Sequence, residues 1–161
     1  MAKVLNYGMV GGGPDAFIGD AHRRAISLDE SARLVAGVFS RNAEKSKKMG
    51  EVLHIEEERC YKDYETMALE EAKREDGIDF VVVVTPNASH YEICKAFLNA
   101  GIHVVCDKPV TTTYEKAVEL QKLAEEKSLL FMVTYTYMGH VTAKYARDLI
   151  ASGAIGDVRA V

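Results

Sequence analysis

Residues 3–24 have the sequence KVLNYGMVGGGPDAFIGDAHRR, and the rest of the chain repeats the pattern that this stretch begins. The apolar residues between Val4 and Val10 are typical of a buried parallel strand. Three glycines at 11–13 then interrupt the regular backbone, because only glycine turns this sharply without steric cost. Pro14 suits the first turn of a helix, since its φ is already fixed near the helical value. The stretch therefore predicts a strand, a glycine turn and a helix.

The glycine turn also has the spacing of an anion site. Gly11, Gly13 and Ala16 match G-x-G-x-x-G/A, and Gly19 is a second candidate for the third small position. Free N–H groups at a helix N-terminus, aided by the helix dipole, bind a pyrophosphate in this pattern. A glycine turn without any ligand can match the same pattern, so a purely structural role for this turn remains an alternative.

Composition narrows the class of protein. The chain has 161 residues, of which 48% are hydrophobic and 27% charged, as in an ordinary globular domain. A net charge of −4 without long basic runs argues against nucleic acid as a partner. The longest apolar run, 78–84, is too short to span a membrane. Without a signal pattern, Cys60, Cys94 and Cys106 indicate reduced thiols in the cytoplasm, and their spacing predicts no metal site.

Strands and helices alternate along the chain, which predicts an α/β fold with a doubly wound parallel sheet. The six predicted strands are 4–10, 33–40, 60–61, 79–85, 102–106 and 129–135. The sequence of 79–85, DFVVVVT, is apolar almost throughout, which favours the centre of the sheet. Ligands of such sheets bind at the carboxyl ends of the strands. The loops 11–19, 85–90 and 107–109 should meet there.

Ser40 and Arg41 close the second predicted strand, where dinucleotide folds usually place an acid for the adenosine ribose. An acid would repel a 2′-phosphate, whereas Arg41 would pair with one and stack on adenine. We therefore favour NADP over NAD as the cofactor. A solvated surface arginine is the alternative interpretation.

The loop after the central strand contains Thr85, Pro86 and Asn87. Pro86 fixes the turn and Asn87 can cap the next helix, so capping alone and cofactor lining both stay open. His90 lies in the first turn of that helix, where positive charge is disfavoured. A neutral imidazole there either contacts the cofactor or satisfies the backbone of the loop.

Asp107, Lys108 and Pro109 end the next strand. A lysine at this place can orient the nicotinamide ribose, or bond a substrate hydroxyl and help to move its proton during hydride transfer. The bland alternative is an ion pair between Lys108 and Asp107.

Two segments together resemble the glucose-fructose oxidoreductase / inositol dehydrogenase / MocA (Gfo/Idh/MocA) family of pyridine-nucleotide oxidoreductases. Residues 8–25, GMVGGGPDAFIGDAHRRA, are similar to a longer glycine-loop variant of that family. Residues 81–113, VVVVTPNASHYEICKAFLNAGIHVVCDKPVTTT, are similar to the family's segment from the Thr-Pro-Asn loop to the Glu-Lys-Pro motif. Asp107 stands where the family usually has Glu, and Lys108 matches its catalytic lysine.

The resemblance implies a Rossmann-type domain of an NAD(P)-dependent oxidoreductase. Its small-molecule substrate would carry a secondary alcohol, as in a sugar, polyol or related compound. The predicted cofactor-binding residues are Gly11, Gly13, Phe17, Ile18, Ser40, Arg41, Thr85, Pro86, Asn87, His90, Asp107, Lys108 and Pro109. Lys108 is also the predicted catalytic residue. A non-enzymatic NAD(P)-binding regulatory module is the alternative, because the family includes dinucleotide-binding regulators.

The resemblance also implies a second, C-terminal domain that this sequence has no room for. We expect a dinucleotide-binding domain at 1–135, a connecting helix at 136–153, and the first strand of a truncated α+β domain at 154–161. The missing part would hold most substrate contacts and a catalytic histidine, so the chain alone should bind cofactor with negligible turnover. An unpaired edge on the last strand makes a homo-oligomer a further hypothesis.

Overall fold

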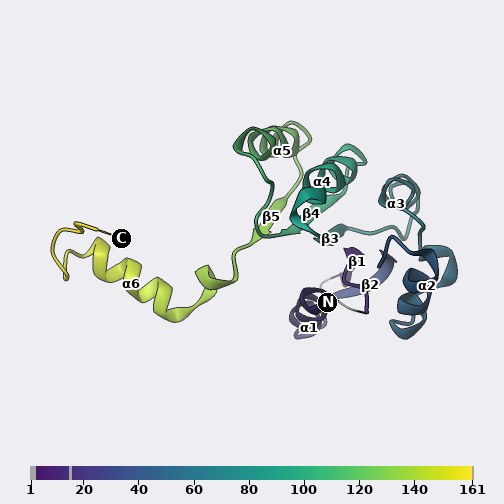
Figure 1. Ribbon diagram of the computed structural model, residues 1–161, viewed down its shortest axis with the longest axis horizontal. Helices are drawn as coiled ribbons and strands as arrows, with labels where there is room; N and C mark the ends of the chain where they lie inside the picture. Colours follow the sequence, from purple (N-terminus) through teal and green to yellow (C-terminus); the bar gives the residue numbers. More distant parts are fainter. Residues whose placement is uncertain (1–2, 15, 161) are drawn as a thin grey trace.

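Five parallel strands form a single sheet in the computed structural model, which describes residues 3–14 and 16–160 (Figure 1). The strand order is β2-β1-β3-β4-β5. The chain runs outward from β1 to β2 and then returns to β3 on the other side of β1, which creates a topological switch point. The strands are β1 (Leu5–Gly11), β2 (Ala32–Val38), β3 (Phe80–Val84), β4 (His103–Asp107) and β5 (Phe131–Thr134). The predicted doubly wound parallel sheet is confirmed.

The predicted count of six strands is wrong by one. Cys60 makes only an isolated bridge to Gly37, and the Tyr61 N–H donates to the Gly37 carbonyl at 2.9 Å. A short 3-10 helix, η1 (Glu57–Arg59), precedes this bridge, and Asp63 already caps the next helix. The segment between them is too short to extend a ladder, so the predicted strand at 60–61 is reduced to a single contact.

Three of the helices begin at a residue whose side chain caps them: Asn42, Asp63 and Thr113. Asn42 accepts a hydrogen bond from the Lys45 amide at 3.0 Å, and Asp63 accepts one from the Thr66 amide at 2.7 Å. These bonds satisfy N–H groups that have no partner within the helix. The helices are α1 (Phe17–Ser27), α2 (Ala43–Val52), α3 (Tyr64–Glu71), α4 (His90–Asn99), α5 (Tyr114–Glu126) and α6 (Val141–Ala151).

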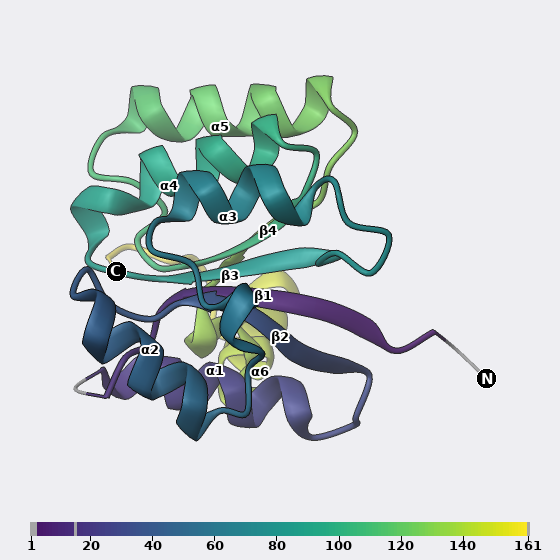
Figure 2. The ribbon, with the colours of Figure 1, turned by 90° about the vertical axis from the view of Figure 1, so that its right-hand side faces the viewer.

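Helices cover both faces of the sheet (Figure 2). One core contains residues of α3, α4 and α5, and the second contains residues of α1 and α2. Alternate residues of β3 enter the two cores: Val81 and Val83 belong to the first, Val82 and Val84 to the second. The first three of these are fully buried. The central position predicted for this strand is confirmed.

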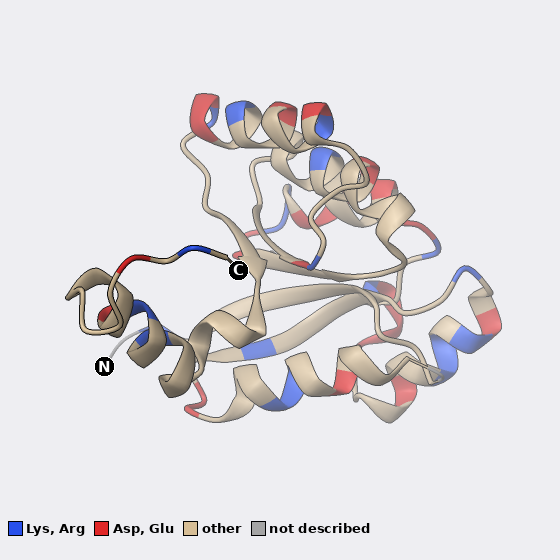
Figure 3. Ribbon diagram, turned by 60° about the vertical axis from the view of Figure 1, so that its left-hand side comes forward, with Lys and Arg blue, Asp and Glu red and all other residues tan. Residues whose placement is uncertain are grey.

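Charged residues lie mainly on the helices and loops, where both signs are interspersed (Figure 3). No helix within 3–14 and 16–160 is both long and apolar enough to cross a membrane.

The C-terminal helix α6 lies away from the sheet (Figure 1). None of its residues is buried, and Val141 and Tyr145 are 81% and 63% exposed. Residues 154–160 form turns and coil rather than the strand that the sequence predicts there. The division into domains at residues 135 and 153 stays a prediction.

Candidate functional site

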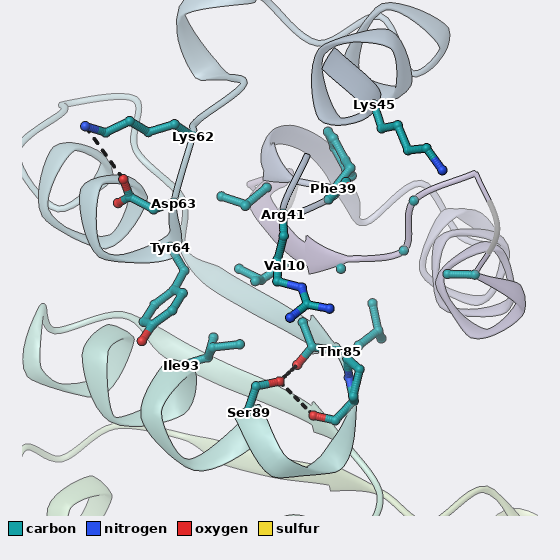
Figure 4. A pocket seen from close by; sticks show the side chains of 18 of the residues that line it. Val10, Phe39, Arg41, Lys45, Lys62, Asp63, Tyr64, Thr85, Ser89 and Ile93 are labelled. Carbon is teal, nitrogen blue, oxygen red and sulfur yellow. Dashed lines mark hydrogen bonds and ion pairs between the residues drawn. The ribbon is translucent and has the colours of Figure 1, made fainter. Parts of the chain in front are cut away.

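A cleft of about 720 Å³ opens at the carboxyl ends of β1, β2 and β3 (Figure 4). Four segments form its walls: the glycine turn after β1, the residues after β2, the loop after β3, and residues 62–65 at the start of α3. Ile93 of α4 completes the lining. The cleft thus lies at the switch point of the sheet, where ligands of doubly wound folds bind.

The glycine turn is wedged between the ends of two strands. Gly11 has φ +93°, and a Cβ atom there would lie 2.6 Å from the Val84 carbonyl oxygen. A Cβ atom on Gly13 would lie 2.5 Å from the carbonyl oxygen of Phe39. Contacts this short do not occur between real atoms, so both positions require glycine. The turn therefore keeps its backbone close to β2 and β3 and leaves the space in front of it open.

Gly19 provides the close packing of helix against turn. A Cβ atom on Gly19 would lie 2.4 Å from the Gly12 Cα, so only glycine permits this approach. Of the two candidates for the third small position, Gly19 fills the packing role, whereas Ala16 lines the cleft. Arg23, one turn further along α1, donates to the Gly12 carbonyl at 3.0 Å and braces the turn. Sequence analysis missed Arg23, although its i+4 spacing from Gly19 places both on one helix face.

The end of β2 presents Ser40 and Arg41 to the cleft. The Ser40 hydroxyl accepts from the Asn42 amide at 3.1 Å, which fixes the turn into α2. The Arg41 guanidinium projects into the cleft (Figure 4), and within the described part of the chain it has no hydrogen bond or ion pair. Lys45 and Lys62 also line the cleft, as do Asp63 and Glu65, and Lys62 lies 3.8 Å from the Asp63 carboxylate.

Thr85 and Pro86 form the wall after β3. The Ser89 hydroxyl lies 2.8 Å from Thr85 Oγ1 and 2.7 Å from the Pro86 carbonyl oxygen, so it holds the loop in shape (Figure 4). Asn87 starts the short 3-10 helix η2 (Asn87–Ser89), is exposed, and lies outside the lining of the cleft.

His90 is fully buried and does not line the cleft. Its Nε2 lies 2.8 Å from the Thr85 carbonyl oxygen, and its Nδ1 lies 2.9 Å from the Pro109 carbonyl oxygen. Of the two roles considered from sequence, the structure therefore places His90 against the loop backbone. Burial opposes its charging, but the neighbouring Cys106 sulfur and the two carbonyls outweigh burial and raise the pKa of His90 to about 9.

Asp107, at the end of β4, turns its carboxylate toward β5 and α1. Thr134 Oγ1 donates to it at 3.0 Å, and His22 Nε2 lies 3.7 Å from the same oxygen. Burial lowers the pKa of His22, although Asp107 opposes this shift, so the imidazole is neutral near pH 7. Lys108 is exposed and, among the residues that the structure describes, makes no ion pair with Asp107. The alternative interpretation from sequence, an ion pair between Lys108 and Asp107, is therefore absent from the described residues.

Phe17 and Ile18 open helix α1 beside the glycine turn. Phe17 is 88% exposed, whereas Ile18 packs against the core that contains Tyr7 and Met9. Neither lines the cleft. Of the predicted cofactor-binding residues, the cleft brings together Gly11, Gly13, Ser40, Arg41, Thr85 and Pro86. Those outside its lining are Phe17, Ile18, Asn87, His90, Asp107, Lys108 and Pro109.

A glycine turn that opens a helix at the switch point of a parallel sheet defines a dinucleotide-binding domain of the Rossmann type. The chain belongs to the Gfo/Idh/MocA family of oxidoreductases. Residues 5–135 match that family's model, which is described as "Oxidoreductase family, NAD-binding Rossmann fold". The resemblance noted from the glycine turn and the Asp107-Lys108-Pro109 segment is confirmed.

Individual relatives extend far beyond this chain, and two of the three described here cover almost all of it. The uncharacterized oxidoreductase YfiI of Bacillus subtilis is 45% identical over 100% of this chain, which spans 41% of that protein. The crystal structure of an inositol dehydrogenase homolog from Azotobacter vinelandii, complexed with NADH and myo-inositol, has a TM-score of 0.94 and 42% identity. The match covers 99% of this chain and 42% of the chain in that crystal structure. The scyllo-inositol 2-dehydrogenase (NADP(+)) IolW of Bacillus subtilis is 36% identical over 56% of this chain, and the match spans 25% of that enzyme.

Proposed function

We propose that this chain binds NADP or NAD for an oxidoreductase that transfers hydride between nicotinamide and a secondary alcohol of a sugar, polyol or related compound. The observation that carries the proposal is the glycine turn wedged against Val84 and Phe39 at the mouth of the cleft. A side chain at Gly11 or Gly13 would collide with the backbone of Val84 or Phe39 and push the turn out of place, which would displace the amides that a pyrophosphate needs. The myo-inositol bound to the homolog from Azotobacter vinelandii supports the substrate class.

Three walls of the cleft have a role in this proposal. The amides of residues 11–13 and the N-terminus of α1 hold the pyrophosphate. Ser40 and Arg41 bind the adenosine ribose, and Thr85 and Pro86 line the middle of the cofactor. When bound, nicotinamide supplies the hydride acceptor or donor. Lys108, one strand further along the sheet, orients the reacting hydroxyl and moves its proton.

The charge of the cleft supports a preference for NADP. The Arg41 guanidinium projects into the cleft where the 2′-phosphate of NADP would lie, and Lys45 lines the same end. A guanidinium binds phosphate in a bidentate manner, and such charge-assisted bonds contribute about 1.5–3 kcal/mol. One relative is described with NADH and another with NADP(+), so similarity alone does not choose between the two cofactors. The charge of Arg41 is the argument that favours NADP.

Calorimetric titration with NADP⁺ and NAD⁺ tests cofactor binding and preference together. We expect NADP⁺ to bind about tenfold more tightly than NAD⁺. Arg41→Ala should weaken NADP⁺ binding by about tenfold and leave NAD⁺ binding unchanged, because only the 2′-phosphate contact is lost. Arg24→Ala is the matched control, since Arg24 is exposed on α1 and pairs with Asp20 at 2.8 Å outside the cleft. Equal affinities for both cofactors would refute the preference, and no binding of either would refute the proposed function.

A further inference from the structure

His90 connects two backbone segments that lie far apart in the sequence. Its Nε2 meets the Thr85 carbonyl oxygen at 2.8 Å, on the loop that lines the cleft. Its Nδ1 meets the carbonyl oxygen of Pro109 at 2.9 Å, one residue after Lys108. The ring is fully buried, so no solvent competes for either nitrogen.

The two partners of His90 determine its protonation state. A backbone carbonyl oxygen can only accept a hydrogen bond, so each contact requires a proton on the imidazole nitrogen that faces it. A neutral imidazole has one N–H and one bare lone pair, and would place that lone pair against a carbonyl oxygen. Only the imidazolium, which donates from both nitrogens, satisfies both contacts at these distances.

A sulfur atom in the same core favours the positive charge of such an imidazolium. Two thiols complete the set of titratable groups around the ring: Cys106 on β4 faces His90, and Cys94 on α4 faces Cys106. The hydrogen bond from Cys94 and the proximity of His90 lower the pKa of the Cys106 thiol against the opposing effect of burial, and this sulfur also lies 3.3 Å from the Asp107 carbonyl oxygen, to which the thiol donates. Both cysteines are fully buried. The Cys106 sulfur raises the pKa of His90 and so acts against the unfavourable dipole at the start of α4.

We propose that His90 is a positioning residue which, as a doubly donating imidazolium, ties the Thr85 loop of the cofactor cleft to the backbone that carries Lys108. These two hydrogen bonds, which we call the tie, fix the distance between the cleft wall and Lys108, while His90 itself contacts neither cofactor nor substrate. Only its last step, the placement of Lys108 at the reacting end, rests on the proposed function. His90 differs in this from a cofactor contact, because the ring is closed off from the cleft.

Nitrogen NMR of the chain labelled in its histidine rings tests the protonation state directly. At pH 7 both nitrogens of His90 should be protonated, and one should lose its proton as the pH rises through about 9. The Val110 amide belongs to the same peptide group as the Pro109 carbonyl, so its resonance should shift with the same midpoint. Cys106→Ser should move this midpoint to lower pH, because it removes the sulfur that raises the pKa of His90. A single protonated nitrogen on His90 at pH 7 would overturn the proposal.

The pH dependence of NADP⁺ affinity tests the functional step. The folded-state pKa of about 9 lies above the ordinary value of 6.5. The tie is therefore complete below pH 6.5 and is lost as the pH rises through 9. We expect affinity to weaken about fivefold between pH 7 and a pH well above 9, and His90→Asn to weaken it about fivefold at pH 7 and to remove the pH dependence. His54→Asn is the matched control, since His54 is an exposed loop residue.

Two further outcomes separate the inference from the proposed function. If NADP⁺ and NAD⁺ do not bind at all, the proposed function fails, while the ring nitrogens and the Val110 amide still decide whether the tie exists. If NADP⁺ binds but His90→Asn behaves as His54→Asn does at every pH, the positioning role of His90 is refuted.

Discussion

Replacement of Gly11 by alanine should lower the free energy of unfolding and weaken NADP⁺ binding together. A residue other than glycine at φ +93° costs about 1–2 kcal/mol, and the forced contact adds about 1–3 kcal/mol. The new Cβ atom would lie 2.6 Å from the Val84 carbonyl oxygen, so the turn must move away from β3. Moving the turn displaces the amides that would hold the pyrophosphate, and we expect affinity to fall at least about tenfold.

Gly101→Ala separates the cost of backbone strain from the cost of the forced Cβ contact. Gly101 also has positive φ, +82°, but no heavy atom lies within 4 Å of the Cβ position there. This variant should lose about 1 kcal/mol of stability from backbone strain alone and keep its full affinity for NADP⁺. Urea unfolding and calorimetry of both variants give the two quantities. If Gly11→Ala matches Gly101→Ala in stability and still binds NADP⁺ normally, the turn is neither tightly packed nor part of the site.

Local signals in the sequence were sufficient for the parts of the fold that depend on neighbouring residues. The glycines at 11–13 indicated the turn, because few other residues accept its backbone, and the unbroken apolar run at 79–85 indicated a strand buried on both faces. The caps at Asn42 and Asp63 are local in the same way, because each side chain accepts from an amide only three residues further on. The predicted strand at 60–61 was wrong for the opposite reason, because whether Cys60 extends a ladder depends on where α3 begins.

The parts of the site that depend on residues far apart could not be predicted in the same way. The approach of His22 to Asp107 joins α1 to the end of β4, across 85 residues, and no local spacing indicates it. His90 shows the same limit. Its position at the start of a helix argued for a neutral ring, whereas the carbonyl of Pro109 and the sulfur of Cys106 come from a different strand end and reverse that argument. The Asp107 carboxylate likewise meets Thr134 and His22, which are distant in the sequence, whereas among the described residues Lys108 makes no ion pair with it.

Glu71→Ala should be among the most destabilising single substitutions in the chain, with a loss of about 3–5 kcal/mol. Glu71 is 1% exposed and accepts from Arg59 Nε at 3.1 Å and Nη2 at 2.5 Å. It also accepts from the Tyr61 hydroxyl at 2.8 Å and from the Ile78 amide at 3.2 Å. Alanine would leave Arg59, itself 3% exposed, as a buried cation with only Asp76 at 3.3 Å. A domain of this kind has about 5–15 kcal/mol in total, so much of its stability depends on one carboxylate.

Two comparisons make this prediction specific to the buried pair. Glu70→Ala, one residue earlier, removes an exposed ion pair to Lys73 at 2.9 Å and should change the free energy of unfolding by less than about 1 kcal/mol. Replacing both Arg59 and Glu71 by leucine removes the charge together with its partner. Because no unpaired ion then remains in the core, the double variant should recover much of the loss. Guanidinium unfolding curves of the three variants decide the matter. A cost for Glu71→Ala no larger than that for Glu70→Ala would mean that water or Asp76 compensates Arg59.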